Sequence, residues 1–134
     1  YPEGISSGMC RRVEINRALM SDPKVLLLDE PSRGIDALTK IVTQNALLEL
    51  YDMSQKTVLF ITHDLEEAIY LADRVLVMTT RPGRVKQSMF VNLPRPRRLE
   101  MLASPELLRL KDEAVEAVHE EAVKAFAAGE REFA

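Results

Sequence analysis

Two adjacent carboxylates, Asp29 and Glu30, follow an unbroken apolar run and are the residues of this chain best suited to chemistry. The run Val25–Leu28 shows no polar alternation, which is typical of a strand buried on both faces of a parallel sheet. Open α/β sheets bind ligands at the carboxyl ends of their strands, so both acids are expected at a crevice. There, one carboxylate could hold a divalent cation and the other could take a proton from water. That is the chemistry of nucleotide hydrolysis, although a core strand followed by a polar turn is the competing interpretation.

A second apolar run, Thr57–Ile61, also ends in polar residues, among them His63. A helix predicted over Ala37–Met53 lies between the two runs and completes a βαβ unit, whose strands should be parallel. Its broad apolar face is expected to consist of Leu38, Ile41, Val42, Leu47, Leu48, Leu50 and Tyr51. His63 is therefore expected at the same sheet edge as the two acids. An imidazole there can donate a hydrogen bond to a phosphate or to an attacking water. His119, inside a later acidic helix, is expected to face solvent and take no part.

A third candidate lies near the N-terminus, where Ile5–Met9 precedes a helix predicted to end at about Met20. Serine hydroxyls, backbone N–H groups and the positive end of the helix dipole together make a phosphate site. A serine-capped helix without a ligand is the alternative. Farther on, a turn containing Gly34 leads to Asp36, which is placed to cap the next helix.

In this order and at these separations, the segments resemble the signature loop, Walker B strand, D-loop and switch histidine of the ATP-binding cassette (ABC) ATPases. The resemblance is to the ATPase subunits of nitrate, sulfonate and taurine importers. The tail Leu93–Leu102, followed by Ser104–Glu106, is similar to that of nitrate/nitrite/cyanate or bicarbonate importers. The implied fold is α/β: the C-terminal half of a P-loop (RecA-like) nucleotide-binding domain, with a parallel sheet flanked by helices, plus a C-terminal helix. Residues 1–91 would form this domain part, and 92–134 a Pro/Arg linker and helix.

The resemblance also implies roles for individual residues. Asp29 would hold Mg²⁺ through water, Glu30 would polarise the attacking water, and His63 would stabilise the γ-phosphate. The residues implied to contact ATP held by a second ATPase subunit, or to line that interface, are Ser6, Ser7, Gly8, Met9 and Asp36. Ser7 departs from the family pattern, because glycine is usual there and lets the backbone approach a phosphate closely.

By the same resemblance, the expected cofactors are ATP and Mg²⁺, and the expected partners are a second ATPase subunit, membrane permeases and, indirectly, a periplasmic or extracellular solute-binding protein. The expected place is the cytoplasmic face of the plasma (inner) membrane, and the expected solute is a small anion such as nitrate. The net charge of −3 argues against a general nucleic-acid binder. The single cysteine, Cys10, excludes an internal disulfide and fits a reducing cytoplasm.

No Gly-x-x-x-x-Gly-Lys-Ser/Thr loop is present, since none of the five glycines precedes a lysine. With a start at Tyr1 in mid-motif, the chain is interpreted as the C-terminal part of a larger domain. The isolated polypeptide is expected not to hydrolyse ATP. Two alternatives stay open: a degenerate, noncatalytic subunit that only docks to transporter partners, and a soluble ABC ATPase acting on nucleic acid.

The remaining elements are expected to be scaffold. A short helix over Leu65–Ala72, capped by Asp64, is followed by strands near Val75–Met78 and Val85–Val91. Asn92–Arg98 is interpreted as a solvated linker whose arginines could instead meet anionic lipid or another subunit. A long helix should start at Ser104-Pro105 and reach about Ala127, before Gly129, with its apolar stripe on Leu107, Leu110, Ala114, Val118 and Ala122.

Overall fold

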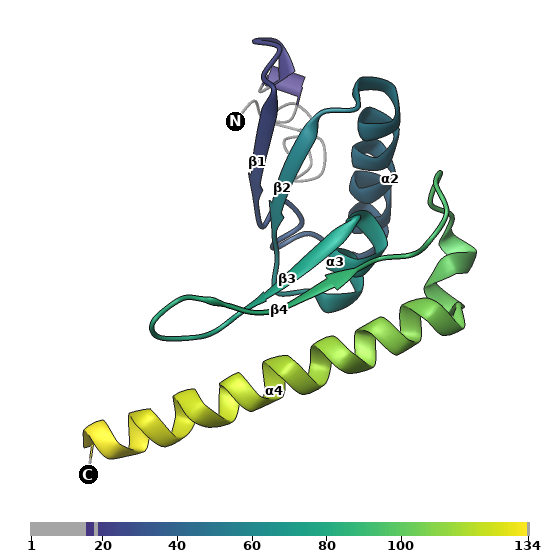
Figure 1. Cartoon of the computed structure of the whole chain (residues 1–134). Coiled ribbons are helices and arrows are strands. Elements are labelled where there is room, and N and C mark those ends of the chain that lie inside the picture. The colour runs from purple at the N-terminus through teal and green to yellow at the C-terminus, as the bar shows by residue number, and fades with distance from the viewer. Residues whose placement is uncertain (1–15, 18, 134) are drawn as a thin grey trace. The chain divides into compact units, whose positions relative to one another are not determined.

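A computed structural model describes residues 16, 17 and 19–133 of the chain (Figure 1). The contacts divide the chain into two compact units, Tyr1–His63 and Asp64–Ala134, called unit 1 and unit 2 below. Unit 1 contains β1 (Val25–Asp29), α2 (Ala37–Ser54) and β2 (Thr57–Ile61). Unit 2 contains α3 (Leu65–Leu71), β3 (Arg74–Met78), β4 (Val85–Phe90), the 3-10 helix η1 (Leu99–Ala103) and α4 (Pro105–Phe133). The boundary expected after residue 91 lies inside unit 2.

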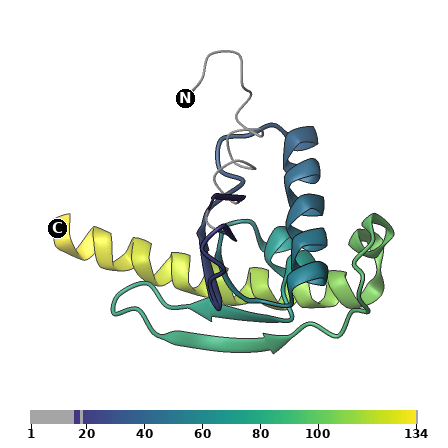
Figure 2. The same cartoon turned by 90° about the horizontal axis from the view of Figure 1, so that it is seen from above.

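In unit 1 the βαβ prediction is confirmed, because β1 and β2 pair in parallel and α2 connects them. The register joins Val25 to Thr57 at one end and Asp29 to Ile61 at the other. Figures 1 and 2 show α2 running alongside the two strands. The carboxyl ends of both strands therefore meet at one edge of this small sheet.

The expectation that β1 is buried on both faces is wrong for this chain. Leu26 and Leu28 are buried, whereas Val25 and Leu27 are 60% and 61% exposed. Because side chains alternate along a strand, these two pairs point to opposite faces of the sheet. α2 borders one face, and no described residue of unit 1 buries Leu27 on the other. An apolar run indicates that both faces of a strand are suited to burial. It does not show which elements pack on those faces.

α2 turns a narrower face inward than its apolar residues predicted. Leu47 and Leu48 are buried, but Leu38 is 74% exposed, since one helix beside two strands buries only one stripe. Thr43 also lies in that stripe, where its hydroxyl donates a hydrogen bond to the carbonyl of Thr39 at 2.9 Å. Ile41 and Val42, also predicted to face inward, are exposed as well.

In unit 2, β3 and β4 form an antiparallel hairpin, separate from the β1–β2 sheet. Thr79 closes the connection: its N–H donates to the carbonyl of Arg84 at 2.8 Å, and its hydroxyl donates to the carbonyl of Pro82 at 2.6 Å. α4 contacts α3, η1 and both strands of this hairpin. Unit 2 is thus a hairpin and a short helix assembled on one long helix.

The buried stripe of α4 consists of Leu107, Leu110, Ala114, Ala117 and Glu121. The predicted stripe is correct for its first three members and wrong for Val118 and Ala122, which are exposed. Steps of three and four residues that alternate keep to one face of a helix, whereas repeated steps of four drift around it. α4 also continues through Gly129 to Phe133, beyond the predicted end, because one glycine among good helix formers costs only about 1 kcal/mol.

The segment interpreted as a solvated linker is part of the core of unit 2, which corrects that prediction. Arg97 is only 7% exposed. Its guanidinium donates to the carbonyls of Tyr70 at 3.1 Å and Ala72 at 2.7 Å, and to the carbonyls of Leu93 and Pro94. Arg95 donates to the carbonyl of Leu71 at 2.8 Å. The two arginines therefore satisfy the last carbonyl groups of α3, which have no partner within the helix.

A second charged network joins α4 to the β3–β4 hairpin. The ammonium of Lys86 lies 2.7 Å from Glu120 Oε2 and 3.1 Å from Glu121 Oε1, and it donates to the carbonyl of Ala117 at 3.0 Å. The N–H of Thr80 donates to Glu121 Oε2 at 3.4 Å. The hydrogen bonds from Lys86 lower the pKa values of Glu120 and Glu121, and the same bonds raise the pKa of Lys86.

The described helices include none that is long and apolar enough to cross a membrane.

Candidate functional site

The structure brings Glu30 and His63 together at the carboxyl ends of β1 and β2. The N–H of Glu30 donates to the carbonyl of Ile61 at 2.7 Å and so extends the strand pairing by one residue. His63 follows two residues after Ile61, and its Nε2 lies 3.1 Å from Glu30 Oε1. The juxtaposition expected from a parallel βαβ unit is therefore present in unit 1.

The two side chains differ in their exposure to solvent. The side chain of Glu30 is 17% exposed, and that of His63 is 93% exposed. Glu30 Oε1 is itself buried and accepts no hydrogen bond from any described residue, because the close contact with His63 lacks hydrogen-bond alignment. A buried acceptor without a donor is unfavourable by about 1–3 kcal/mol, so such an atom is poised to accept from a water or a ligand.

The backbone of Glu30 is also strained. Its φ of 49° lies in the left-handed region, where a residue with a Cβ costs about 1–2 kcal/mol. The ladder bond to Ile61 holds the N–H of Glu30, and the carbonyl of Glu30 accepts from the N–H of Arg33 at 3.1 Å. A turn therefore begins at Glu30 and ends the strand there, and the carboxylate of Glu30 lies beside His63 at this sheet edge.

Asp29 and Asp36 occupy different surroundings from Glu30. Asp29 is the last residue of β1 and is exposed at the same strand end. Asp36 is the N-cap of α2: its Oδ1 accepts from the N–H of Thr39 at 2.7 Å, and this bond lowers its pKa. The capping role of Asp36 is confirmed, and its expected place at a subunit interface stays a prediction. Ser6, Ser7, Gly8 and Met9 lie outside the described residues.

One functional candidate was missed at the sequence level. The Nε of Arg33, a residue of the turn before α2 for which no role was predicted, lies 3.9 Å from Glu30 Oε2. The sequence does contain a signal for this contact, because Arg33 carries the opposite charge three residues after Glu30. It also directly precedes Gly34, whose φ of 77° allows the turn. His119 is exposed on α4, as expected.

The oxygen donors at this edge fit a magnesium ion that is bound mainly by other ligands. Among the described residues, no three His, Cys, Asp or Glu side chains gather as a metal site. Mg²⁺ commonly keeps several waters and takes one or two carboxylates together with phosphate oxygens. Asp29 and Glu30 are adjacent in sequence at the end of β1, and their carboxylate oxygens are donors of this kind.

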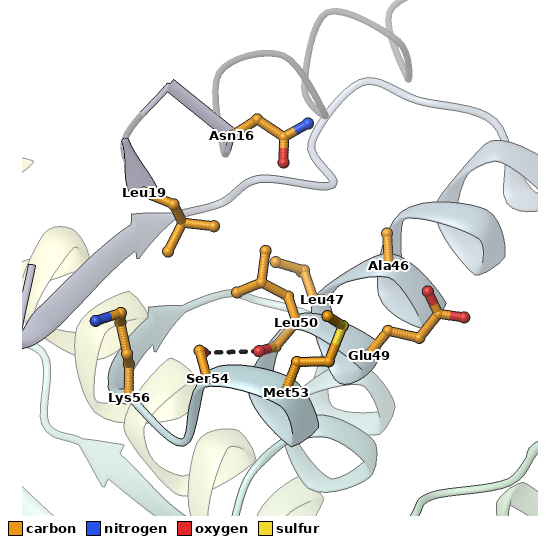
Figure 3. Close-up of a pocket in the computed structure, with 9 residues that line it drawn as sticks. All are labelled: Asn16, Leu19, Ala46, Leu47, Glu49, Leu50, Met53, Ser54 and Lys56. Atoms are coloured by element: carbon orange, nitrogen blue, oxygen red, sulfur yellow. Dashed lines mark hydrogen bonds between the residues drawn. The ribbon is translucent and has the colours of Figure 1, made fainter. Parts of the chain in front are cut away.

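A pocket of about 480 Å³ lies elsewhere in unit 1 (Figure 3). Leu47, Leu50 and Met53 of α2 line it together with Leu19 and with Lys56, which directly precedes β2. Since β1 and β2 are parallel, this pocket is at their amino end, opposite the edge that holds Glu30 and His63. The candidate site is therefore an open strand edge and not this pocket.

The chain was also compared with known proteins. Residues 1–33 match the ABC transporter family. An uncharacterized ABC transporter ATP-binding protein of Methanocaldococcus jannaschii is 48% identical over 97 residues, covering 72% of this chain and 36% of the relative. The chain is thus similar in sequence to ABC transporter ATP-binding proteins.

Two further matches are proteins whose names state a transported solute. An aliphatic sulfonates import ATP-binding protein of Pseudomonas savastanoi pv. phaseolicola is 46% identical over 119 residues, covering 89% of this chain and 49% of the relative. A protein of the same name from Bacillus cereus is 47% identical over 97 residues, covering 72% of this chain and 39% of the relative. The chain spans less than half the length of each of these three ABC relatives.

Proposed function

We propose that this chain is the C-terminal part of the nucleotide-binding domain of an ABC importer, and that the complete domain hydrolyses ATP through Glu30 and His63. The observation that supports this most directly is the 3.1 Å approach of His63 Nε2 to Glu30 Oε1 at one strand edge. The similarity to ABC transporter ATP-binding proteins supports the nature of the substrate. The P-loop NTPase fold follows from the same relationship.

The proposed mechanism divides the work among three side chains. Magnesium-bound ATP supplies the phosphoanhydride and part of the charge neutralisation. Oε1 of Glu30, which is buried and has no donor among the described residues, accepts a hydrogen bond from the attacking water and acts as the base toward its proton. His63, exposed beside it, donates from Nε2 to a phosphate oxygen, and Asp29 holds the cation through water. Catalysis of this kind depends on positioning and charge, so the register of β1 and β2 matters directly.

The remaining groups of the site belong, in this proposal, to other parts of the assembly. A second ATPase subunit completes each site, with Ser6, Ser7, Gly8 and Met9 contacting its ATP and Asp36 near the interface. Membrane permeases and an external solute-binding protein are the other partners, and the subunit lies peripherally on the cytoplasmic face of the membrane. The 134 residues alone do not hydrolyse ATP, since they contain no phosphate-binding Gly-Lys loop.

The solute proposed is a small oxyanion. The tail Leu93–Leu102 is similar to that of nitrate/nitrite/cyanate or bicarbonate importers, whereas two relatives are named for aliphatic sulfonates. Uptake of labelled nitrate and of a labelled alkanesulfonate by cells with and without the gene separates the two. Loss of nitrate uptake alone supports nitrate, and loss of sulfonate uptake alone supports sulfonate.

The test of hydrolysis uses the protein expressed from its complete coding region. Glu30→Gln should lower the magnesium-dependent ATPase rate by a factor of about 10² or more, because it removes the group that acts on water. The same change at Glu116, an exposed residue of α4, is the control and should leave the rate unaltered. His63→Ala should likewise lower the rate, with His119→Ala as its control.

Three outcomes separate the interpretations of the chain. Turnover that persists in Glu30→Gln contradicts the proposal. Binding of ATP without turnover in the unaltered protein supports the noncatalytic docking subunit instead. ATPase activity of the isolated 134 residues that Glu30→Gln abolishes would show that this part of the domain suffices.

A further inference from the structure

We propose that Arg33 is a positioning residue of this site, which holds the carboxylate of Glu30 in the orientation that receives the attacking water. The inference rests on the proposed function, since it assigns Arg33 to the same reaction. It starts from the two oxygens of Glu30, which face different neighbours: Oε1 lies 3.1 Å from His63 Nε2, and Oε2 lies 3.9 Å from Arg33 Nε.

The backbone accounts for the position of Arg33. Its N–H donates to the carbonyl of Glu30 at 3.1 Å, which closes the turn and brings residue 33 back beside residue 30. Glu30 at φ 49° and Gly34 at φ 77° bracket this turn in left-handed conformations. A strained turn of this kind restricts the orientation of the Glu30 side chain and brings the guanidinium of Arg33 near its Oε2.

The exposure of the two partners argues against a role in stability. The side chain of Arg33 is 79% exposed, whereas that of Glu30 is 17% exposed. An ion pair with one partner in solvent contributes little to folding. A cation beside Oε2 orients the carboxylate so that Oε1, for which no described residue is a donor, stays available to accept a hydrogen bond. The consequence is a rate effect without a comparable effect on folding.

The experiment compares Arg33→Gln, which removes the charge at similar length, with Arg33→Lys, which keeps it. Both are made in the protein from the complete coding region. Arg81→Gln serves as the control, because Arg81 is an exposed arginine of the β3–β4 connection. Arg33→Gln should lower kcat by about two- to five-fold, the range expected for an exposed ion pair, with KM for ATP little changed. Arg33→Lys should recover at least half of that loss.

Salt supplies a readout that a purely structural role would not move. The ratio of kcat between wild type and Arg33→Gln should approach one at about 1 M salt, where the screening length falls to about 3 Å. Equal kcat in Arg33→Gln and Arg81→Gln, while Glu30→Gln is inactive, overturns the inference and leaves the proposed function intact. An unfolding midpoint of Arg33→Gln well below that of wild type also overturns it. Turnover that persists in Glu30→Gln removes both proposals.

Discussion

Glu30 of unit 1 and Glu121 of unit 2 are both largely buried carboxylates, yet their surroundings are opposite. The side chain of Glu121 is 8% exposed, with Lys86, Lys124 and the N–H of Thr80 within reach. Glu30 keeps a buried oxygen for which no described residue is a hydrogen-bond donor. Buried polar groups that serve the fold are normally satisfied, so an unsatisfied one indicates a group reserved for something else.

The same difference extends to the backbone around each carboxylate. Glu30 has a left-handed φ at a strand end, whereas Glu121 lies in the regular helix α4. Leu27 in the sheet of unit 1 is also exposed, whereas the stripe of α4 in unit 2 is buried. Unit 2 therefore has the features of a structural scaffold. Unit 1 instead contains a strained backbone at Glu30 and an exposed apolar side chain at Leu27, and neither stabilises a fold.

The largest expected effect concerns the apolar contacts of the two units. Leu110→Ala in α4 should lower the free energy of unfolding by about 2–5 kcal/mol, because Leu110 is 2% exposed and the change leaves a cavity. Leu27→Ala in β1 should cost less than about 1 kcal/mol, because Leu27 is largely in solvent. Denaturant unfolding of the 134-residue chain measures both. Equal losses would mean that Leu27 is covered in solution and that the contrast between the units is smaller than described.

A smaller effect is expected from the adjacent arginines of residues 97 and 98. Arg97→Met should cost about 1–3 kcal/mol, since it leaves buried carbonyls at the end of α3 without donors. Arg98→Met is the matched control, because Arg98 is exposed, and it should change stability by about 0.5 kcal/mol at most. Hydrogen exchange should show faster opening of α3 in Arg97→Met only. Similar hydrogen-exchange rates of α3 in the two variants would indicate that Arg97 is solvated, as the linker interpretation predicted.

The smallest expected effect depends on pH and compares the two carboxylates directly. The native pKa of Glu121 is below its ordinary value of 4.5, so its ionised form stabilises the fold above that pH. This stabilisation is lost as the pH falls through the lowered native pKa. Glu121→Gln should therefore lower the thermal midpoint at pH 7, and its difference from wild type should shrink below about pH 4.

Glu30→Gln is the comparison for this measurement. It should leave the midpoint at pH 7 close to that of wild type, because Oε1 accepts no hydrogen bond from a described residue and the ion pair of Oε2 with Arg33 is exposed. A midpoint that drops as much in Glu30→Gln as in Glu121→Gln would show that Glu30 serves the fold after all.

Local sequence signals were sufficient for most of the elements. The apolar runs that became β1 and β2 were correctly placed, and Asp36, Asp64 and Ser104 accept the capping bonds expected of them. These features depend on residues a few positions apart, which a sequence displays directly. The approach of His63 to Glu30 was also predictable, because a βαβ unit fixes the relative direction of its strands. Their chemical roles stay predictions.

The errors concern partners that are far apart in the chain. Arg97 was predicted to be solvated because the acceptors that tie it to the end of α3 are backbone carbonyls 25 and 27 residues earlier, and no side-chain pattern marks a carbonyl as an acceptor. Leu27 was assigned to the core because an apolar run does not reveal which elements cover it. The stripe of α4 was misplaced at Val118 because steps of three and of four residues are equally compatible with an amphipathic pattern.

The use of Arg95 and Arg97 to complete α3 has a consequence for any exchange of tails between related proteins. Composition alone suggests a cut at residue 92, where the Pro/Arg segment starts. A chimera joined there would remove the donors to the carbonyls of Tyr70, Leu71 and Ala72 at the end of α3. Residues 92–97 should therefore be kept together with α3 from the same protein, and a better junction for a chimera is the start of η1 at Leu99.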